Sequence, residues 1–577
     1  MKKLIIIHLI CALVAGCSNG RNEQSATKIA DRVFIGDYIY TVDENRPWAQ
    51  ALAIKDDKII YVGDRQSVTD YIGESTQVDT LGKQMLLPGF IDSHAHPVMG
   101  GAYIRSLALD TFATPEHWYQ QIADYAKQHD NDEILFGFGF LASAFGPQGP
   151  DKRRLDEIVA DKPVFIFDEG FHGAWVNSKA LELLAVNANT PDPVPGFSYY
   201  KRDENHQPTG YLLEGTATDA VSRLGILTRD RVAAGTADVI SVMNQFGITS
   251  VFDAGALDVD RVQLDVLELL AQNQQLTVRY VGSHMIKSQQ GFADGVKQAI
   301  EKRRIASGDG YQINMLKIMN DGTIEGKTAA MHTDYQQEVG NRGETVFDEQ
   351  QMTQILSQAT AADMDVHIHA LGERAISEAL NAIEAVKRDY PSHSNRFTLC
   401  HIQVMTDADV QRFAELGVIA QSTPLWASYD EYGKAFVNDD QFQRYFRFNS
   451  LNEAGVTLSF GSDFPASGAG ILGMSPVFNM EIGHTRQNPG EPQAPIQPGE
   501  NERLDIASLI EGYTLGAAHQ LRMESQIGSL EVGKMADLVI LQNNLFDVEP
   551  YDIHQVEVVE TILAGKAVYV SDEAFVE

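Results

Sequence analysis

The chain has 577 residues, enough for more than one domain, and 44% of them are hydrophobic, so it can bury a large core. Its formal net charge of −34, from 45 basic and 79 acidic residues, repels phosphate backbones and argues against nucleic acid as a partner. After the N-terminal segment, no apolar run reaches the ~20 residues that are needed to cross a bilayer.

Residues 1–17 have the features of an export signal. Two lysines precede an apolar stretch from residue 4 to residue 15, which has the length of a signal-peptide core. Small residues then lead to Cys17, as in bacterial lipoprotein signals. We therefore expect an exported protein that is cleaved before Cys17 and carries a lipid on its sulfur, and Ser18 favours the outer membrane. An ordinary secretory signal is the alternative. Residues 18–27 are polar and aperiodic, which predicts a tether.

Short apolar segments at both ends of the chain predict a small β-sandwich. Residues 28–87 contain five of them, and two more follow near the C-terminus. They are Asp31–Tyr40, Ala51–Lys55, Lys58–Val62, Gln77–Asp79, Met85–Leu86, Ala536–Leu541 and Val556–Val570. We expect residues 28–87 and 526–577 to assemble into one domain, with the rest of the chain between them.

Two histidines stand two residues apart directly after this N-terminal part. Pro88-Gly89 breaks the chain, and the apolar strand that follows ends in His94-Ala95-His96. Because side chains alternate across a strand, His94 and His96 point to the same side. Neutral imidazole is a common ligand of zinc and similar ions. An isolated pair could equally be two surface or core histidines, so the assignment depends on the rest of the chain.

A long segment separates this strand from the next. Residues 100–235 contain strands of their own, Ile134–Phe140 and Val164–Phe167, and far exceed a usual strand-to-helix connection. We expect this insertion to emerge from the top of strand one and to form a lid. His172 and Trp175 lie in it, and they either contact substrate or pack the lid.

Four later apolar segments end in a residue that can take part in a metal site. They end at Lys317, His369, His401 and Asp463. Strands alternate with helical stretches through residues 88–525, which is the layout of an α/β parallel barrel with its site at the carboxyl ends of the strands. The other expected strands are Thr249–Asp253, Thr277–Ser283 and one that ends near Gln421.

Three further side chains have more than one interpretation. His367 shares a face with His369 and could replace it as a ligand. Cys400 could be a nucleophile or a soft ligand, but its place beside His401 predicts a buried packing residue that points away from the barrel mouth. Asp92 shares the face of His94, and a structural role lower in the barrel is expected.

These segments resemble the amidohydrolase superfamily, and within it the amidohydrolase 3 group, which includes N-substituted formamide deformylase-like enzymes. Residues 172–181, 247–255 and 527–539 are also similar to that group, and the resemblance runs from about Ala30 to Val570. Three positions depart from the usual pattern. They are Cys400, where an acidic residue is usual, Glu373, where aspartate is usual, and Lys327, where arginine is usual.

The resemblance implies a (β/α)8 TIM-type barrel with one or two divalent ions, for which zinc is the expected metal. His94, His96 and Asp463 would hold the more buried ion, and His369 and His401 the second. Lys317 would bridge the two as a carboxylated lysine; the alternative is an ordinary lysine paired with Asp321 or Asp463 in a single-metal site. Catalysis is assigned to Asp463, Lys317 and His401, with Asp463 accepting a proton from water and passing it to the leaving nitrogen.

The predicted function is therefore hydrolysis of a non-peptide C–N bond in a small N-acyl or N-formyl compound. An ester or a cyclic amide could be the substrate on the same scaffold, and a binding lipoprotein without activity is the alternative from another class. The substrate, the metal and the oligomeric state do not follow from the sequence.

Overall fold

The structure is a computed structural model, which describes residues 29–110, 113–168, 173–193, 198–256, 259–324, 326–336, 338–431, 433–466 and 469–572, apart from the side chains at 143, 146 and 147. The predicted signal peptide, Cys17, the tether and His172 lie outside the described residues. Within the described part of the chain, no helix combines the length and the apolarity that crossing a bilayer requires.

The central sheet is a nearly closed parallel barrel, as the sequence predicts. Its eight strands follow the order β20-β19-β18-β17-β16-β14-β13-β6, and the short β15 pairs antiparallel with the first residues of β16. The strands are β6 (Phe90–Ala95), β13 (Ile248–Asp253), β14 (Arg279–Ile286), β15 (Ser307–Gly308), β16 (Tyr311–Met319), β17 (Val366–Ala370), β18 (Phe397–His401), β19 (Ile419–Ser422) and β20 (Leu458–Phe460). β16 continues two residues beyond Lys317, and β20 ends three residues before Asp463.

Helices surround this barrel. They are α1 (Pro97–Tyr103), α6 (Arg229–Gln245), α7 (Asp260–Gln272), α8 (Gly295–Ile305), α9 (Glu349–Ala361), α10 (Glu373–Asp389), α11 (Asp407–Leu416), α12 (Asp439–Gln443), α13 (Phe448–Glu453), α14 (Pro476–Thr485), α15 (Ile506–Gly512) and α16 (Leu515–Gln520). In α10, the buried side chains recur every three or four residues from Ala375 to Val386, as expected of a helix that packs one apolar face on a sheet.

The gap between the first and last barrel strands is closed by the segments that carry the predicted ligands. The backbone N–H of Asp463 donates to the carbonyl of His94 at 2.6 Å, and the N–H of His96 donates to the carbonyl of Phe464 at 2.8 Å. Below them, the buried Asp92 carboxylate accepts from the backbone and hydroxyl of Ser462, at 2.9 and 2.6 Å. Barrel closure itself therefore places Asp463 beside His94 and His96.

Both ends of the chain contribute to a second sheet, of order β23-β22-β21-β5-β1-β2-β3, with β4 paired to β1. Its strands are β1 (Arg32–Tyr40), β2 (Trp48–Lys55), β3 (Lys58–Gly63), β4 (Gln77–Gly82), β5 (Met85–Pro88), β21 (Leu538–Leu541), β22 (Val558–Leu563) and β23 (Lys566–Val570). β5 leads directly into β6 and pairs with β21, so this sheet supports the strand that carries the two histidines. The finer prediction of a sandwich, and the domain boundaries, stay predictions.

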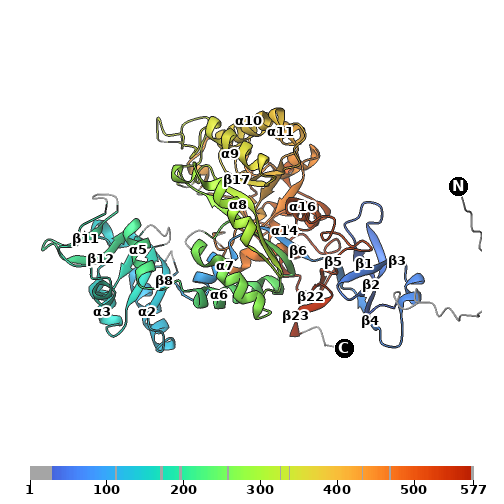
Figure 1. Cartoon of the computed structure of the whole chain (residues 1–577), viewed down its shortest axis with the longest axis horizontal. Coiled ribbons are helices and arrows are strands. Elements are labelled where there is room, and N and C mark those ends of the chain that lie inside the picture. The colour runs from blue at the N-terminus through green and yellow to red at the C-terminus, as the bar shows by residue number, and fades with distance from the viewer. Residues whose placement is uncertain are drawn as a thin grey trace, which may run out of the picture.

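The segment between β6 and β13 forms a lobe with a sheet of its own, of order β11-β12-β10-β9-β8-β7. Its elements are β7 (Leu107–Ala108), α2 (Pro115–Gln128), β8 (Leu135–Phe140), α3 (Lys152–Ile158), β9 (Val164–Asp168), β10 (Gly173–Val176), α4 (Ser178–Leu183), β11 (Tyr200–Arg202), β12 (Pro208–Leu213) and α5 (Gly215–Arg223). In Figure 1 the lobe, in cyan and teal at the left, lies on the opposite side of the barrel from the sheet of the chain ends.

Candidate metal centre

Three side chains converge where the barrel closes. Asp463 Oδ1 lies 3.2 Å from Nε2 of His96 and 3.5 Å from Nε2 of His94. The three ligand atoms lie within 4.8 Å of one another, and the buried Oδ1 has no hydrogen-bond partner. A buried carboxylate oxygen without a donor, facing two imidazole nitrogens, fits a divalent cation. The residues predicted to hold the more buried ion are therefore brought together.

Hydrogen bonds to the far ring nitrogens set the orientation of both histidines. Nδ1 of His96 contacts the carbonyl of Gly255 at 2.7 Å, and Nδ1 of His94 contacts Oε1 of Gln421 at 3.1 Å. With Nδ1 as the donor, each Nε2 keeps its lone pair toward Asp463. Burial, and then the nearby charge of Lys317, hold the pKa of His94 well below its ordinary value, which keeps the ring neutral. For His96, burial lowers the pKa, but Asp463, Asp253 and the carbonyl of Gly255 together raise it above its ordinary value.

His369 and His401 form the other side of the centre. Their ring centroids are 4.6 Å apart. Nδ1 of His369 contacts the fully buried carboxylate of Asp321 at 2.9 Å, so its Nε2 is the nitrogen free to bind a ligand. His401 has φ of +74°, and Asp463 has φ of +53°. Such left-handed backbone is costly for residues other than glycine and gathers at functional sites; here it occurs at two predicted ligands.

Lys317 lies on the floor of the centre and is 1% exposed. Its Nζ is 3.5 Å from Nε2 of His94 and 3.0 Å from Sγ of Cys400. Asp321, one of the two carboxylates considered as its partner, instead accepts hydrogen bonds from His369 and from the backbone of the β17–α10 turn. Within the described residues, the lysine forms no ion pair with a carboxylate.

His367 and Cys400 lie one layer below the centre. Nε2 of His367 contacts Nδ1 of His94 at 2.9 Å, and its ring does not line the cavity, whereas His369 does. Both histidines of β17 point inward, as their spacing predicts. Cys400 is buried, as expected, but its contact with Lys317 makes it more than a packing residue. Burial raises the pKa of its thiol to about 11, which opposes a nucleophilic role.

A cavity of about 640 Å³ opens above these residues, a size typical of sites for small molecules. His94, His96, Lys317, His369, His401 and Asp463 all line it. All six predicted ligands thus meet at one cavity. The sequence does not predict the contacts by which Gln421 and Gly255 orient the ligand candidates, and the alternative that paired Lys317 with Asp321 is not borne out, because Asp321 contacts His369. Gln421 and Gly255 lie at or just after strand ends, which was the available signal.

The structure does not place the described one of the two predicted substrate contacts from the insertion, Trp175, at the cavity. Trp175 is fully buried in the core of the lobe, where it packs on Tyr119, Phe140 and Phe145 and donates from Nε1 to the carbonyl of Asp151 at 3.1 Å. No described residue of the lobe lines the cavity. The structure therefore places Trp175 in a packing role, away from the centre. His172 lies outside the described residues, and the closing of the lobe as a lid stays a prediction.

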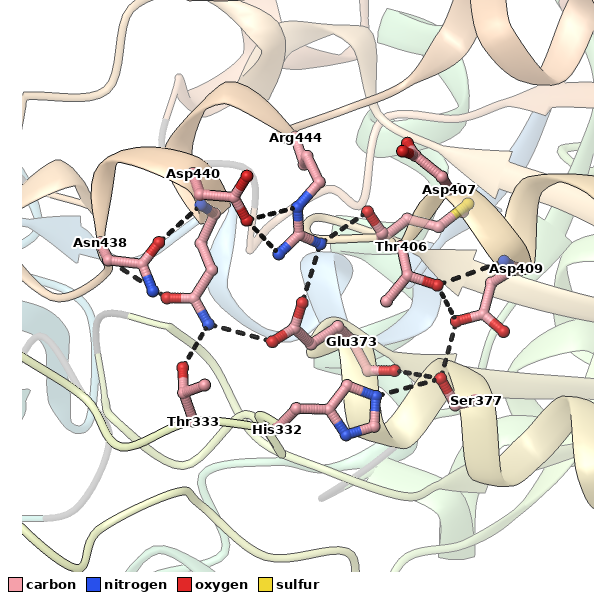
Figure 2. Close-up of polar contacts among 12 residues, drawn as sticks. His332, Thr333, Glu373, Ser377, Thr406, Asp407, Asp409, Asn438, Asp440 and Arg444 are labelled. Carbon is pink, nitrogen blue, oxygen red and sulfur yellow. Dashed lines mark hydrogen bonds and ion pairs between the residues drawn. The ribbon is translucent and has the colours of Figure 1, made fainter.

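A buried polar cluster joins three of the loops at the cavity. Glu373, the first residue of α10, accepts from Gln441 at 3.0 Å and forms an ion pair with Arg444 at 2.8 Å, which Figure 2 shows beside Thr406 and Asp440. Arg444 also donates to the carbonyl of Met405 at 2.8 Å. The cluster thus links the turn after His369, the segment after His401 and helix α12. Glutamate at position 373, where aspartate is usual in the related group, is one methylene longer, which suits its contacts with both Gln441 and Arg444.

Known proteins are similar to this chain over most of its length. N-substituted formamide deformylase from Arthrobacter pascens is 26% identical over 555 residues, which cover 93% of this chain and 98% of the relative. The putative amidohydrolase YtcJ from Bacillus subtilis is 26% identical, with 93% and 99% covered. The exoenzymes regulatory protein AepA from Pectobacterium carotovorum is 28% identical over 442 residues, with 74% and 93% covered.

Solved structures share the fold. An uncharacterized metal-dependent hydrolase from Pyrococcus horikoshii has a TM-score of 0.71 at 23% identity and covers 93% of this chain and 100% of its own. A corresponding structure from Pyrococcus furiosus has a TM-score of 0.70 at 22% identity, with 90% and 99% covered. Residues 78–569 match the amidohydrolase family. With its six ligand candidates at one cavity, the chain belongs to the amidohydrolase family and is a metal-dependent hydrolase of carbon–nitrogen bonds.

Proposed function

We propose that the chain hydrolyses the amide bond of a small N-acyl or N-formyl amine. The observation that carries this proposal is the placement of Asp463, whose unpartnered Oδ1 faces two histidines at the bottom of a cavity of about 640 Å³. A divalent cation, for which zinc suits the histidine and carboxylate ligands, acidifies water and polarises a carbonyl when bound. The relative named N-substituted formamide deformylase supports amide chemistry.

In this proposal, some residues orient the metal ligands, and Asp463 transfers the proton. Gln421 orients the ring of His94, and the carbonyl of Gly255 orients the ring of His96. Asp321 orients His369 in the same way. Asp463 has one oxygen for a ligand role and one to accept a proton from water, which it then delivers to the leaving nitrogen.

Lys317 is proposed to be carboxylated. An ammonium group that is buried without a carboxylate is costly, and the contacts of Nζ are an imidazole and a thiol. A neutral amine that adds CO₂ and loses one proton becomes a carbamate, whose oxygens are suited to two cations. The ion-pair alternative gains no support from Asp321, which is occupied by His369.

The test is a panel of N-acyl and N-formyl amines, with esters and cyclic amides in parallel, offered to protein loaded with zinc. Release of amine is measured beside metal content, and metal-stripped protein and His96→Ala are the controls. We expect amine release only from the loaded wild type. Fully loaded protein that leaves every amide intact contradicts the proposal, and turnover confined to esters or cyclic amides supports those alternatives.

A further inference from the structure

The wall of the cavity is largely apolar around the metal ligands, although four uncharged polar side chains also line it. Six of the lining side chains are large and apolar, and they come from β14, β16 and three loops. They are Met285, Met319, Leu371, Leu425, Trp426 and Phe446. Trp426 packs beside one of the ligand candidates, with its ring centroid 5.5 Å from that of His401. A substituent next to the scissile amide would therefore be buried against the carbon and sulfur atoms of these side chains and removed from water.

The charges in this wall have one sign. Apart from the six residues of the metal centre, the only charged side chain that lines the cavity, among the described residues, is Asp430. One of its oxygens accepts from the backbone N–H of Gly433 at 2.8 Å, and no described basic side chain forms an ion pair with it. The internal residues outside the description include neither arginine nor lysine. The negative charge of Asp430 is thus uncompensated at the cavity.

The nearest basic group on this loop points elsewhere. Lys434 is exposed and does not line the cavity; its Nζ donates to the hydroxyl of Tyr429 at 3.4 Å and lies 6.0 Å from the centroid of that ring. A substrate carboxylate in the cavity would therefore meet Asp430, apolar side chains and the uncharged Thr323, Gln403, Ser428 and Tyr429, with no described guanidinium or ammonium outside the metal centre to receive it. Burying an unpaired carboxylate is costly, and a like charge nearby adds to that cost.

We propose that the physiological substrate is an amide whose amine part is apolar and carries no carboxylate, and that Asp430 is the residue that excludes N-acyl amino acids. This inference rests on the proposed function, because it assigns a substrate class to the same site. The net charge of −34 acts in the same direction, since it disfavours the approach of anions to the cavity.

The experiment compares compounds that differ in one charge. N-formylphenylalanine and N-formylphenylalaninamide have almost the same size, but only the first is an anion; N-phenethylformamide lacks the group altogether. We expect kcat/KM for the two neutral compounds to exceed that for the acid at least ~10-fold, because the site offers the carboxylate no partner. Equal or better hydrolysis of the acid overturns the inference. This holds even if Lys434→Met then abolishes hydrolysis of the acid, because Lys434 would in that case be the partner of the carboxylate.

A matched pair of variants locates the effect. Asp430→Asn keeps an oxygen for the N–H of Gly433 but removes the charge, so the preference for amide over acid should fall at least threefold, as expected when a nearby like charge is removed. Glu431→Gln removes an exposed charge from the next position, outside the cavity lining, and should leave the ratio unchanged. An Asp430→Asn protein that melts like the wild type and keeps the original ratio contradicts the role of Asp430.

A binding measurement separates this inference from the proposed function. Calorimetric titration of zinc-loaded Asp463→Asn protein with each compound reports affinity without turnover. Tighter binding of N-formylphenylalaninamide than of N-formylphenylalanine supports the inference even where the wild type hydrolyses neither, and that result counts against the proposed function alone. Equal binding of the two compounds overturns the inference, whatever the activity.

Discussion

Asp463 combines two roles that a single substitution can separate. It faces His96 at 3.2 Å through one oxygen, so replacement by asparagine keeps an oxygen ligand and the side-chain volume but removes most of the basicity. General-base assistance is worth ~10²–10⁴-fold in rate. We predict that Asp463→Asn loses at least that much kcat and keeps much of its metal, whereas His96→Ala loses the metal. Metal analysis beside turnover checks both; near-normal turnover by fully loaded Asp463→Asn rules out the proton-transfer role.

Lys317 gives a second prediction at the scale of one residue. If the buried amine is carboxylated, protein prepared in isotopically labelled bicarbonate should show a carbamate carbon signal by NMR. Lys317→Met should lack this signal and bind less metal. Lys302, which pairs with Asp260 at 2.6 Å, offers the matched control, because Lys302→Met should leave the signal unchanged. A wild type without the signal, in fully loaded form, contradicts the carbamate.

Four inward-facing histidines were predictable from the sequence because they follow a simple rule. Side chains two apart on a strand share a face, and this placed His94 with His96 and His367 with His369. The rule fails at the end of β18, where the neighbours Cys400 and His401 both reach the centre: Sγ of Cys400 contacts Lys317, and His401 lines the cavity. Partners that act across the barrel, such as Gln421 on Nδ1 of His94, depend on register between distant strands, which no local pattern records.

Three loops at the cavity are held together by the buried Glu373. We predict that Glu373→Gln, which leaves half-buried Arg444 without its main counter-charge, lowers the free energy of unfolding by ~1–3 kcal/mol. Because the cluster supports the turn after His369, KM should rise more than kcat falls. Denaturant titration and steady-state kinetics measure the two effects.

The matched control for this cluster is Asp440→Asn. Asp440 is the other acidic partner of Arg444, but its side chain is 82% exposed, so its removal should change the free energy of unfolding by less than ~0.5 kcal/mol. If both variants lose the same free energy of unfolding, or neither loses any, then the burial of Glu373 does not make its ion pair more stabilising than that of Asp440.

At the scale of elements, the barrel strands were predictable and the lobe only in part. Six of the eight barrel strands, β17 and β18 among them, are short runs that are buried along their whole length, and such runs are visible in the sequence. Strands β8 and β9 were found for the same reason. The position of the lobe depends on packing between elements, and its aromatic residues, Trp175 among them, form a core of their own. Aromatic content alone does not separate such a core from a substrate wall.

At the scale of the whole molecule, the lipid anchor remains a prediction, because Cys17 lies outside the described residues. We expect labelled palmitate to enter the wild type but not Cys17→Ser, and the variant to leave the membrane fraction. Its kcat/KM should match that of the wild type, because the tether separates the anchor from the folded part. Equal labelling of both proteins, or of neither, contradicts the anchor.

Metal binding should also stabilise the whole fold. The ligands come from strands at both sides of the barrel closure, so an ion that binds His94, His96 and Asp463 binds the folded chain alone. At a free concentration 100 times its Kd, such an ion adds ~2.7 kcal/mol. We predict that chelation lowers the melting temperature and that zinc restores it. His96→Ala should show neither change, whereas His332→Ala, which removes an exposed histidine that contacts Ser377, should behave as the wild type. A wild-type melting temperature that is indifferent to chelation, despite measured loss of metal, would mean that barrel closure does not depend on the ion.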